Sequence, residues 1–390
     1  MEEKKKYDGK YLAKSVCGKI LGGLCVCVLC FASVAASAFL LKDLFMNNSD
    51  PGGTNNKAVV DYAMMDRYDM AMTNTQANAL DGILSLKKVY WLKDSDQVAP
   101  KPNQAFYGET DDPSTLQWLL DEAAELLDGQ TTYFSTETKI YPGTKVMYYL
   151  DDTILAITWK EEYNWMCHTV SEVKIAHPSQ FRRFLAGGEY GSSIQLTTTE
   201  MSASVNAVVA SAADFYKYRR AGIIVYDGKL QRMDGASLDT CFVDEESNLI
   251  LVKANELTTP EAVNQFIEEN NIRFSLAFGP ILIRDGQRCE PQRYGLGEVD
   301  EKYSRAGIGQ RGELHYFFTT INYQFSGNAA TIREFAAAAE RLGCDQFYTL
   351  DGGQTATIAM NNQLINAVDY GSQRKISDII YFATAVPNGG

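Results

Sequence analysis

The sequence lacks the features that usually mark zinc-binding and nucleic-acid-binding proteins. The cysteines after residue 42 are scattered and show no CxxC spacing, which excludes a recognisable zinc signature: Cys167, Cys241, Cys289 and Cys344. An excess of basic charge is also missing. The formal net charge is −13 and the pI is about 4.8, whereas nucleic-acid binding usually needs a basic face. We therefore expect no metal, no cofactor and no nucleic-acid partner.

These four cysteines leave two interpretations open. Outside the cytoplasm they can form disulfides, although the spacing of cysteines does not reveal their pairing. Alternatively, they are buried free thiols that pack as small apolar side chains.

Residues 20–41 form a run of 22 residues without a charged side chain. As a helix this run would be about 33 Å long, which is enough to cross a bilayer. Six lysines precede it, and Asp43 follows it. The positive-inside rule then predicts a cytoplasmic tail at residues 1–19 and an extracytoplasmic C-terminal region. We therefore expect a single-pass protein of the cell membrane.

A cleavable signal peptide is the alternative for this segment, because Ala36-Ser37-Ala38 resembles a cleavage site. The apolar run is longer than the roughly 7–15 residues of a signal-peptide core, which favours an uncleaved anchor.

After the anchor, the pattern predicts a linker and helical segment at 42–129 and a larger domain at 130–390. In the larger domain, short apolar runs flank the pairs Asp227-Gly228, Asp285-Gly286 and Asn361-Asn362, which are typical of tight hairpin turns. A helix is predicted at 260–269 and an amphipathic helix at 331–342. We expect an α+β fold with a mixed, largely antiparallel sheet and flanking helices.

One short motif suggests a site in this domain. Residues 346–350 read as a strand, and Asp351-Gly352-Gly353 follows directly. Two glycines allow a sharp turn and a close approach of the backbone to a ligand. Taken alone, such a motif is more often only a turn.

Six sequence blocks carry a resemblance to a known family. They are Thr198-Thr199-Glu200, AVVASAADFY at 207–216, GIIVYDGKL at 222–230, AFGP at 277–280, RAGIGQRGELHY at 305–316, and residues 350–366 leading into RKISD at 374–378. In order and approximate spacing they resemble the phosphodiester glycosidase family. This family includes the enzyme that uncovers mannose 6-phosphate and membrane-anchored bacterial proteins associated with exopolysaccharides. The similarity covers roughly residues 145–385.

The resemblance implies cleavage between a sugar and the phosphate of a phosphodiester. It implies catalytic roles for Asp214, Asp351 and Arg305, because carboxylates commonly serve glycosidic cleavage and an arginine fork suits a phosphodiester. It further implies substrate-binding positions at Glu200, His315, Gly352, Gly353 and Asp378. For His315, at the start of a strand, a structural role is the alternative. The partner would be a sugar phosphodiester or an envelope glycan.

Several positions depart from the pattern of the family. Ala212 stands in place of an asparagine, Ala277 of a serine, Asn322 of an aspartate, Gln324 of an arginine, and Gln354 of a glycine. These changes remove polar groups, or add a side chain, in the expected site loops. Three functions therefore remain open. The protein is a hydrolase, or a catalytically degraded member that binds glycans or proteins, or a structural domain tethered beside the membrane.

Overall fold

The computed structural model describes residues 98–126, 131–291, 293, 299–322 and 329–386. The chain divides into two units, residues 1–71 and 72–390, and all of the described residues belong to the second. The expected anchor at 20–41 and most of the expected helical segment lie outside the described residues. Across the described ranges, no helix is long and apolar enough to cross a membrane.

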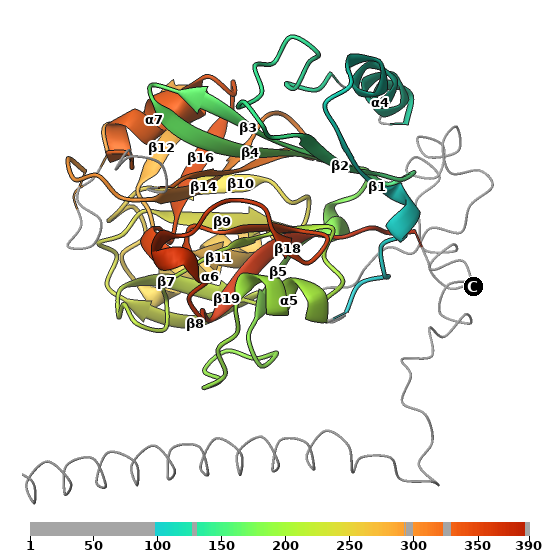
Figure 1. The fold of residues 1–390 in the computed structure, drawn as a ribbon. Helices are drawn as coiled ribbons and strands as arrows, with labels where there is room; N and C mark the ends of the chain where they lie inside the picture. The colour runs from blue at the N-terminus through green and yellow to red at the C-terminus, as the bar shows by residue number, and fades with distance from the viewer. Residues whose placement is uncertain (1–97, 127–130, 292, 294–298, 323–328, 387–390) are drawn as a thin grey trace, which may run out of the picture. The chain divides into compact units, whose positions relative to one another are not determined.

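The largest sheet has nine strands, and every strand pair in it is antiparallel (Figure 1). In spatial order its strands are β1 (Tyr107–Thr110), β2 (Val146–Leu150), β3 (Ile154–Tyr163), β4 (Met166–Ile175), β15 (His315–Ile321), β14 (Arg305–Gln310), β16 (Gln346–Leu350), β12 (Ile281–Arg284) and β13 (Gln287–Arg288).

Three smaller antiparallel sheets complete the strand structure of the described residues. The five-stranded sheet consists of β18 (Gln363–Leu364), β17 (Ile358–Met360), β6 (Val209–Ala212), β19 (Asp378–Phe382) and β5 (Phe181–Leu185), in that order. The three-stranded sheet consists of β10 (Leu249–Val252), β9 (Thr240–Asp244) and β11 (Ile272–Leu276). The two-stranded sheet is the hairpin of β7 (Gly222–Tyr226) and β8 (Lys229–Asp234).

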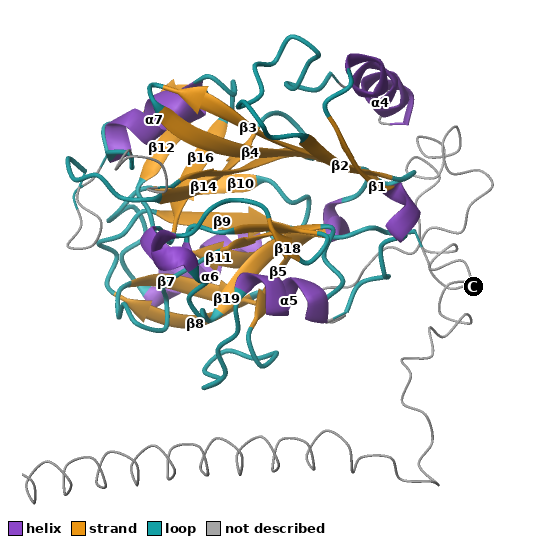
Figure 2. Ribbon diagram, in the orientation of Figure 1, coloured by secondary structure: helices purple, strands orange, loops and turns teal. Residues whose placement is uncertain are grey.

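The helices cover the outer faces of the sheets (Figure 2). They are α4 (Pro113–Leu126), α5 (Thr198–Ser204), α6 (Pro260–Glu269) and α7 (Ile332–Glu340), and the short 3₁₀ turns are η1 (Gln104–Phe106), η2 (Pro178–Gln180), η3 (Gly353–Thr355) and η4 (Asp369–Gly371). Helices α4 and α7 share one apolar cluster with the outer face of the nine-stranded sheet. Helix α5 packs on the outer face of the five-stranded sheet, and α6 packs on β7, β9 and β11.

The main core lies between the nine-stranded sheet on one side and the five- and three-stranded sheets on the other. Strand β15 shows which residue types this arrangement requires. Tyr316 and Phe318 point into the main core, and Phe317 and Ile321 point toward α7. A strand buried on both faces must be apolar at nearly every position, which explains the almost continuous apolar run in HYFFTTI.

The fold agrees with the α+β, largely antiparallel architecture expected from the sequence. The three predicted hairpins are present as β7–β8, β12–β13 and β17–β18. Their turns place Asp227, Asp285, Asn361 and Asn362 at positive φ, a conformation that aspartate and asparagine tolerate better than most residues. Helix α7 begins at a capping box, in which Thr331 and Glu334 each bond the backbone of the other.

Strand β1 and helix α4 belong to the same unit as the sheets. The sequence pattern predicted that their residues belong to a separate segment, 42–129. In the structure, β1 pairs with β2 and α4 joins the outer apolar cluster. The cysteines among the described residues are free thiols, two buried and two partly buried.

Candidate functional site

Two sheets meet where β6 and β16 end. Strand β16 belongs to the nine-stranded sheet and is followed by Asp351, and β6 belongs to the five-stranded sheet and runs toward Asp214. The backbone N–H of Asp351 donates to the carbonyl of Ala213 at 3.0 Å. The ends of two strands from different sheets therefore bring two aspartates from sequence blocks 137 positions apart to one junction.

A third aspartate joins them from β19. The backbone N–H of Asp214 donates to Oδ1 of Asp378 at 3.3 Å. Asp378 is fully buried, and Asp214 is 2% exposed. The oxygens of Asp214 accept backbone N–H groups from Phe215 at 2.6 Å and from Ala277 at 2.7 Å. The carboxylates of both residues are therefore fixed in orientation.

Arg183 of β5 provides the positive charge of this cluster. Its Nε and Nη2 lie 2.9 and 2.7 Å from Oδ2 of Asp378, and its Nη2 lies 3.7 Å from Oδ2 of Asp214. Its Nη1 donates to the carbonyl of Ser275. Burial raises the pKa of Asp378 to about 6, and the guanidinium of Arg183 limits this rise. A buried ion pair of this kind needs its additional hydrogen bonds to offset the loss of solvation.

Asp351 differs from the other two carboxylates because its charge is poorly compensated. The residue is 7% exposed, and its Oδ2 atom is buried with no hydrogen-bond partner among the described residues. Burial raises the pKa of Asp351 to about 7, and the negative charge of Asp214 adds to the rise. The hydroxyl of Thr355 opposes the rise most, followed by the positive charges of Arg374 and Arg219. A carboxyl group that titrates near neutral pH suits proton transfer.

Arg374 and Arg219 lie on the solvent side of this cluster. Both are partly exposed. Arg374 stacks over Phe215 and Tyr218, with its guanidinium carbon 5.2 and 5.5 Å from the ring centroids. Arg219 donates to the carbonyls of Ala277 and Phe278. These arginines offer positive charge to an anionic ligand that approaches Asp351.

Arg305 does not join the carboxylates, although its backbone is next to them. A Cβ atom added to Gly352 would lie 3.9 Å from the Cα of Arg305. The guanidinium donates to the carbonyls of Ala330 at 2.9 Å and Glu301 at 2.7 Å. Its cross-strand partner Ile321 belongs to the apolar cluster beneath α7, and directly opposite residues share one face of a sheet. Burial lowers the pKa of Arg305 to about 10.

His315 lies at the opposite end of strand β15 from Ile321, the residue that pairs with Arg305. They are six positions apart, which corresponds to about 20 Å along a strand. The Nε2 of His315 is 2.7 Å from Oε1 of the buried Glu172. The oxygens of Glu172 also accept the backbone N–H groups of Tyr133 and Phe134. This network fastens the 131–134 segment to β4.

Glu200 and the two glycines have local contacts that explain their positions. Glu200 completes the capping box of α5, with Oε2 accepting the backbone N–H of Thr197 at 2.7 Å. Gly352 passes close to the carbonyl of Ser304, and a Cβ there would be 2.6 Å from that oxygen. Gly353 adopts a φ of +60°, and its N–H donates to the same carbonyl at 2.8 Å.

The positions that depart from the expected motif have contacts within the protein. The amide of Asn322 donates to the carbonyl of Ala356, and its oxygen accepts from Asn366 at 2.9 Å. The amide of Gln354 donates to the carbonyl of Ser372. Ala212 is buried in the α5 cluster. Gln324 lies outside the described residues.

Sequence reasoning missed three arginines of the site, Arg183, Arg219 and Arg374. Arg183 is bonded to Asp378, 195 positions away, and no local pattern reports such a pair. A signal was nevertheless present, because Arg182 and Arg183 interrupt the apolar strand FRRFL. Charged residues in a buried strand are almost always paired. Within the ranges that the structure describes, no group of three or more histidine, cysteine, aspartate or glutamate side chains is arranged to hold a metal ion.

Comparison with known proteins gives one family and several distant relatives. Residues 202–383 match the family model described as phosphodiester glycosidase. The SPbeta prophage-derived uncharacterized protein YomE of Bacillus subtilis strain 168 is 22% identical over 198 residues, which are 49% of this chain. The aligned part spans only 30% of that relative.

Solved structures with a similar chain trace include two of low sequence identity. One is the catalytic domain of zebrafish N-acetylglucosamine-1-phosphodiester alpha-N-acetylglucosaminidase, auto-inhibited by its pro-peptide. It has a TM-score of 0.48 and 15% identity, covering 59% of this chain and 82% of that one. The other is a hypothetical protein from Synechocystis, with a TM-score of 0.44 and 15% identity, covering 62% and 64%.

The match at 202–383 contains the three aspartates of the buried cluster and both arginines on its solvent side. Residues 202–383 therefore correspond to a phosphodiester glycosidase domain.

Proposed function

We propose that this domain hydrolyses the bond between a sugar and the phosphate of a phosphodiester in cell-envelope or exopolysaccharide glycans. One observation carries the proposal: Asp351 is a buried carboxyl group with an unpartnered oxygen and a pKa of about 7, beside Asp214 and two arginines. Such an arrangement suits a group that gives up and takes up a proton at neutral pH.

The chemistry of the substrate suggests the role of Asp351. A phosphate monoester leaves as a weakly basic anion, so the step that needs assistance is the attack of water on the sugar. In this scheme water forms a bond to the anomeric carbon, the bond from that carbon to the phosphate oxygen breaks, and Asp351 accepts the proton of the water. The negative charge of Asp214 assists by raising the pKa of Asp351. Arg374 and Arg219 bind the phosphate.

The buried cluster holds these groups in place. Arg183 and Asp378 orient Asp214 through the hydrogen bonds described above. Catalytic groups lose much of their effect when their geometry loosens. Arg305 ties the segment before β14 to the segment before α7, through its bonds to Glu301 and Ala330.

A second candidate function is glycan binding without turnover. It is favoured by the side chains of Asn322 and Gln354, which are occupied by hydrogen bonds within the protein. Side chains in that state contribute little to charge stabilisation in a transition state.

We also propose that the domain is displayed outside the cytoplasm, anchored by residues 20–41. This proposal is supported by the uncharged run and the lysines before it. Envelope and exported glycans are present on that side of the membrane.

The test is a turnover assay on the full-length chain, with α- and β-linked sugar phosphodiesters as substrates and the phosphate monoester as the measured product. We expect hydrolysis whose kcat rises as the pH rises through about 7, because Asp351 must be ionised to accept a proton. Asp351→Asn should lower kcat by about 10²- to 10⁴-fold. Asp345→Asn is the matched control, since Asp345 is exposed at the opposite end of β16.

The outcomes separate the two candidates. Equal rates for the wild type and Asp351→Asn would refute the role of Asp351. Binding of the phosphodiester without product in any linkage would establish the second candidate.

A further inference from the structure

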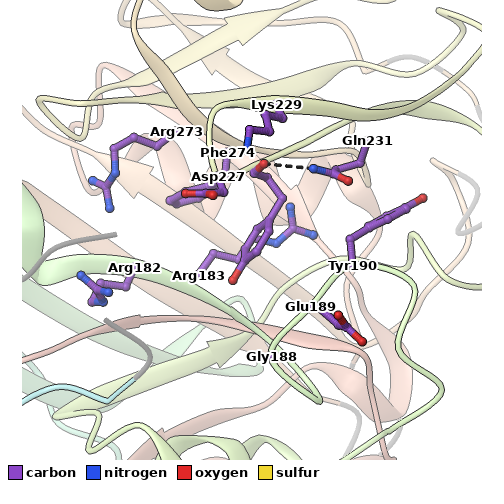
Figure 3. A pocket seen from close by; sticks show the side chains of 11 residues that line it. Arg182, Arg183, Gly188, Glu189, Tyr190, Asp227, Lys229, Gln231, Arg273 and Phe274 are labelled. Carbon is purple, nitrogen blue, oxygen red and sulfur yellow. Dashed lines mark hydrogen bonds between the residues drawn. The ribbon is translucent and has the colours of Figure 1, made fainter. Parts of the chain in front are cut away.

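A cavity of about 450 Å³ lies beside the acidic cluster. Figure 3 shows Asp227, Lys229 and Gln231 of the β7–β8 hairpin on one side, and Arg182 and Arg183 of β5 on the other. Arg182 and Arg183 are adjacent in a strand, so their side chains leave it on opposite faces. A cavity that both of them line must therefore lie at the free edge of β5, which is the outer strand of its sheet.

The cavity is positively charged although the chain is acidic. Its lining contains four cationic side chains, Arg182, Arg183, Lys229 and Arg273, and two carboxylates, Glu189 and Asp227. Both carboxylates and Lys229 are exposed, Arg273 is partly exposed, and Arg182 and Arg183 are buried. Arg183 is already paired with Asp378 and Asp214. The rest of the lining still has three cations to two carboxylates, so the cavity favours an anion in a chain whose net charge is −13.

Hydrogen bonds hold two of the arginines in place. Arg182 donates to the hydroxyl of Tyr381 at 3.1 Å and to the carbonyl of Ser179 at 3.2 Å. Arg273 donates to the carbonyl of Phe181 at 2.8 Å and to the hydroxyl of Ser247 at 2.9 Å. These bonds fix the guanidinium groups before any ligand arrives, which reduces the entropy lost on binding.

Aromatic side chains form the remaining wall. Tyr190, Tyr226 and Phe274 line the cavity, and Tyr190 stacks on Tyr216 at a centroid distance of 5.5 Å. Burial raises the pKa of Tyr226, and the charges of Arg183 and Arg182 oppose the rise. Flat aromatic faces beside polar groups suit a sugar ring, whose C–H face is apolar and whose edge is polar.

Arg183 connects this cavity to the acidic cluster. It lines the cavity, and its guanidinium also binds Asp378 and Asp214. Arg183 thus contacts both the cavity and the carboxylates of the acidic cluster. Strand β5 lies outside the part of the chain that matches the family model.

We propose that this cavity binds a second sugar phosphate of the same glycan, so that the substrate is a chain of phosphate-linked sugars and not a single sugar phosphodiester. The inference rests on the proposed function for the reaction at Asp351 and adds the substrate class. The cavity is within the usual size range of small-molecule sites, about 300–1,000 Å³. Arginines supply the recognition of phosphate, and the tyrosines supply the contact with the sugar.

A binding experiment tests the cavity independently of turnover. Full-length Asp351→Asn is titrated by calorimetry with glucose 1-phosphate, inorganic phosphate and methyl glucoside. We expect glucose 1-phosphate to bind more tightly than phosphate, and methyl glucoside not to bind at the same concentrations. In this background Lys229→Glu should weaken the binding of glucose 1-phosphate by about 3- to 10-fold. Lys139→Glu, an equal change of charge at an exposed lysine outside the cavity, should leave it unchanged.

A second variant tests whether the effect on binding extends beyond the exposed Lys229. Arg273→Gln removes the charge and keeps amide donors, and it should weaken binding about tenfold or more. Thermal unfolding shows whether this variant is folded, and if it is not, Lys229→Glu decides alone. Equal affinity for methyl glucoside and glucose 1-phosphate, or equal weakening by Lys139→Glu and Lys229→Glu, would overturn the proposal.

Turnover then separates the substrate class from the proposed function. Wild-type kcat/KM should be higher for a substrate with a second sugar phosphate than for one with a single phosphodiester, and Lys229→Glu should remove that preference while leaving the single-phosphodiester value unchanged. Turnover without the preference would overturn the cavity's role and leave the proposed function intact. Binding of glucose 1-phosphate without any turnover would refute the hydrolase and leave the cavity a sugar phosphate site.

Discussion

Two buried aspartates of the site differ in how their charges are balanced. Asp378 is paired with the guanidinium of Arg183 at 2.7 Å, whereas Asp351 has one buried oxygen without a partner. Burying a carboxylate without compensation favours its neutral form. Ionisation of Asp351 therefore destabilises the folded state. Such a cost is usual where burial shifts the pKa of a group toward the value needed for proton transfer.

This imbalance predicts how stability depends on pH. The pKa of Asp351 is raised to about 7 in the folded protein, compared with about 3.9 in the unfolded chain. Between these values the folded state binds more protons than the unfolded state, so the contribution of this group to stability falls as the pH rises from about 4 to 7. Asp351→Asn removes the effect and should stabilise the protein at pH 8 by about 1–3 kcal/mol, with a smaller gain at pH 5.

Urea unfolding of the wild type and the variant at pH 5 and pH 8 measures the difference. Asp345→Asn, at the other end of the same strand, is the control and should not change the pH dependence. A variant that is equally or less stable than the wild type at pH 8 would show that Asp351 is better solvated than its burial indicates.

The site was predictable from the sequence only in part. The blocks around Asp214, Asp351 and Asp378 were found, and the structure places these three side chains together. The direction in which the Arg305 side chain points was not predictable, because it depends on which face of β14 meets α7. Arg183 was missed because its strand pairs with β19 at the far end of the sequence. Both cases concern tertiary contacts, about which a local pattern carries no information.

Among the elements, hairpins and capped helices were the most predictable. Their signals are local: a turn residue that tolerates positive φ, or a threonine followed by glutamate three positions later. The assignment of strands to sheets was not predictable. Strand β6 pairs with β17 and β19, and β4 pairs with β15. These pairings follow from how the apolar faces cover one another in three dimensions.

The turn after β16 offers a prediction at the scale of the element, because its two glycines are needed for different reasons. A Cβ on Gly352 would be 2.6 Å from the backbone oxygen of Ser304, which cannot move without displacing β14. Gly352→Ala should therefore destabilise the protein by about 1–3 kcal/mol and displace Asp351. A Cβ on Gly353 meets nothing within 4 Å, but φ is +60°, so Gly353→Ala should cost about 1 kcal/mol.

Urea unfolding compares the two variants, and the turnover assay reports on Asp351. We expect Gly352→Ala to lose most activity and Gly353→Ala to lose less. If the two substitutions have equal effects on both measurements, the contact with Ser304 does not determine the geometry of the turn.

At the scale of the whole molecule, charge is distributed unevenly along the chain. The first nineteen residues contain six lysines, whereas the chain as a whole has a net charge of −13. The described domain buries its apolar side chains in a main core and in clusters beneath its helices. An uncharged run of 22 residues therefore separates a basic segment from an acidic domain, and this is the arrangement on which a prediction of topology rests.

We expect protease added to intact cells, after removal of outer barriers, to digest the domain beyond Asp43 and to spare residues 1–19. Lysines resist translocation and the uncharged run is long enough to remain in the bilayer. A cytoplasmic protein, which must survive the treatment, is the control for cell integrity. Replacing the six lysines by glutamine should lower the fraction of correctly oriented chains, since the positive charges set the orientation. Complete protection of the domain would refute the topology, and release of the domain into the medium with a new N-terminus after Ala38 would show that residues 20–41 act as a cleaved signal peptide.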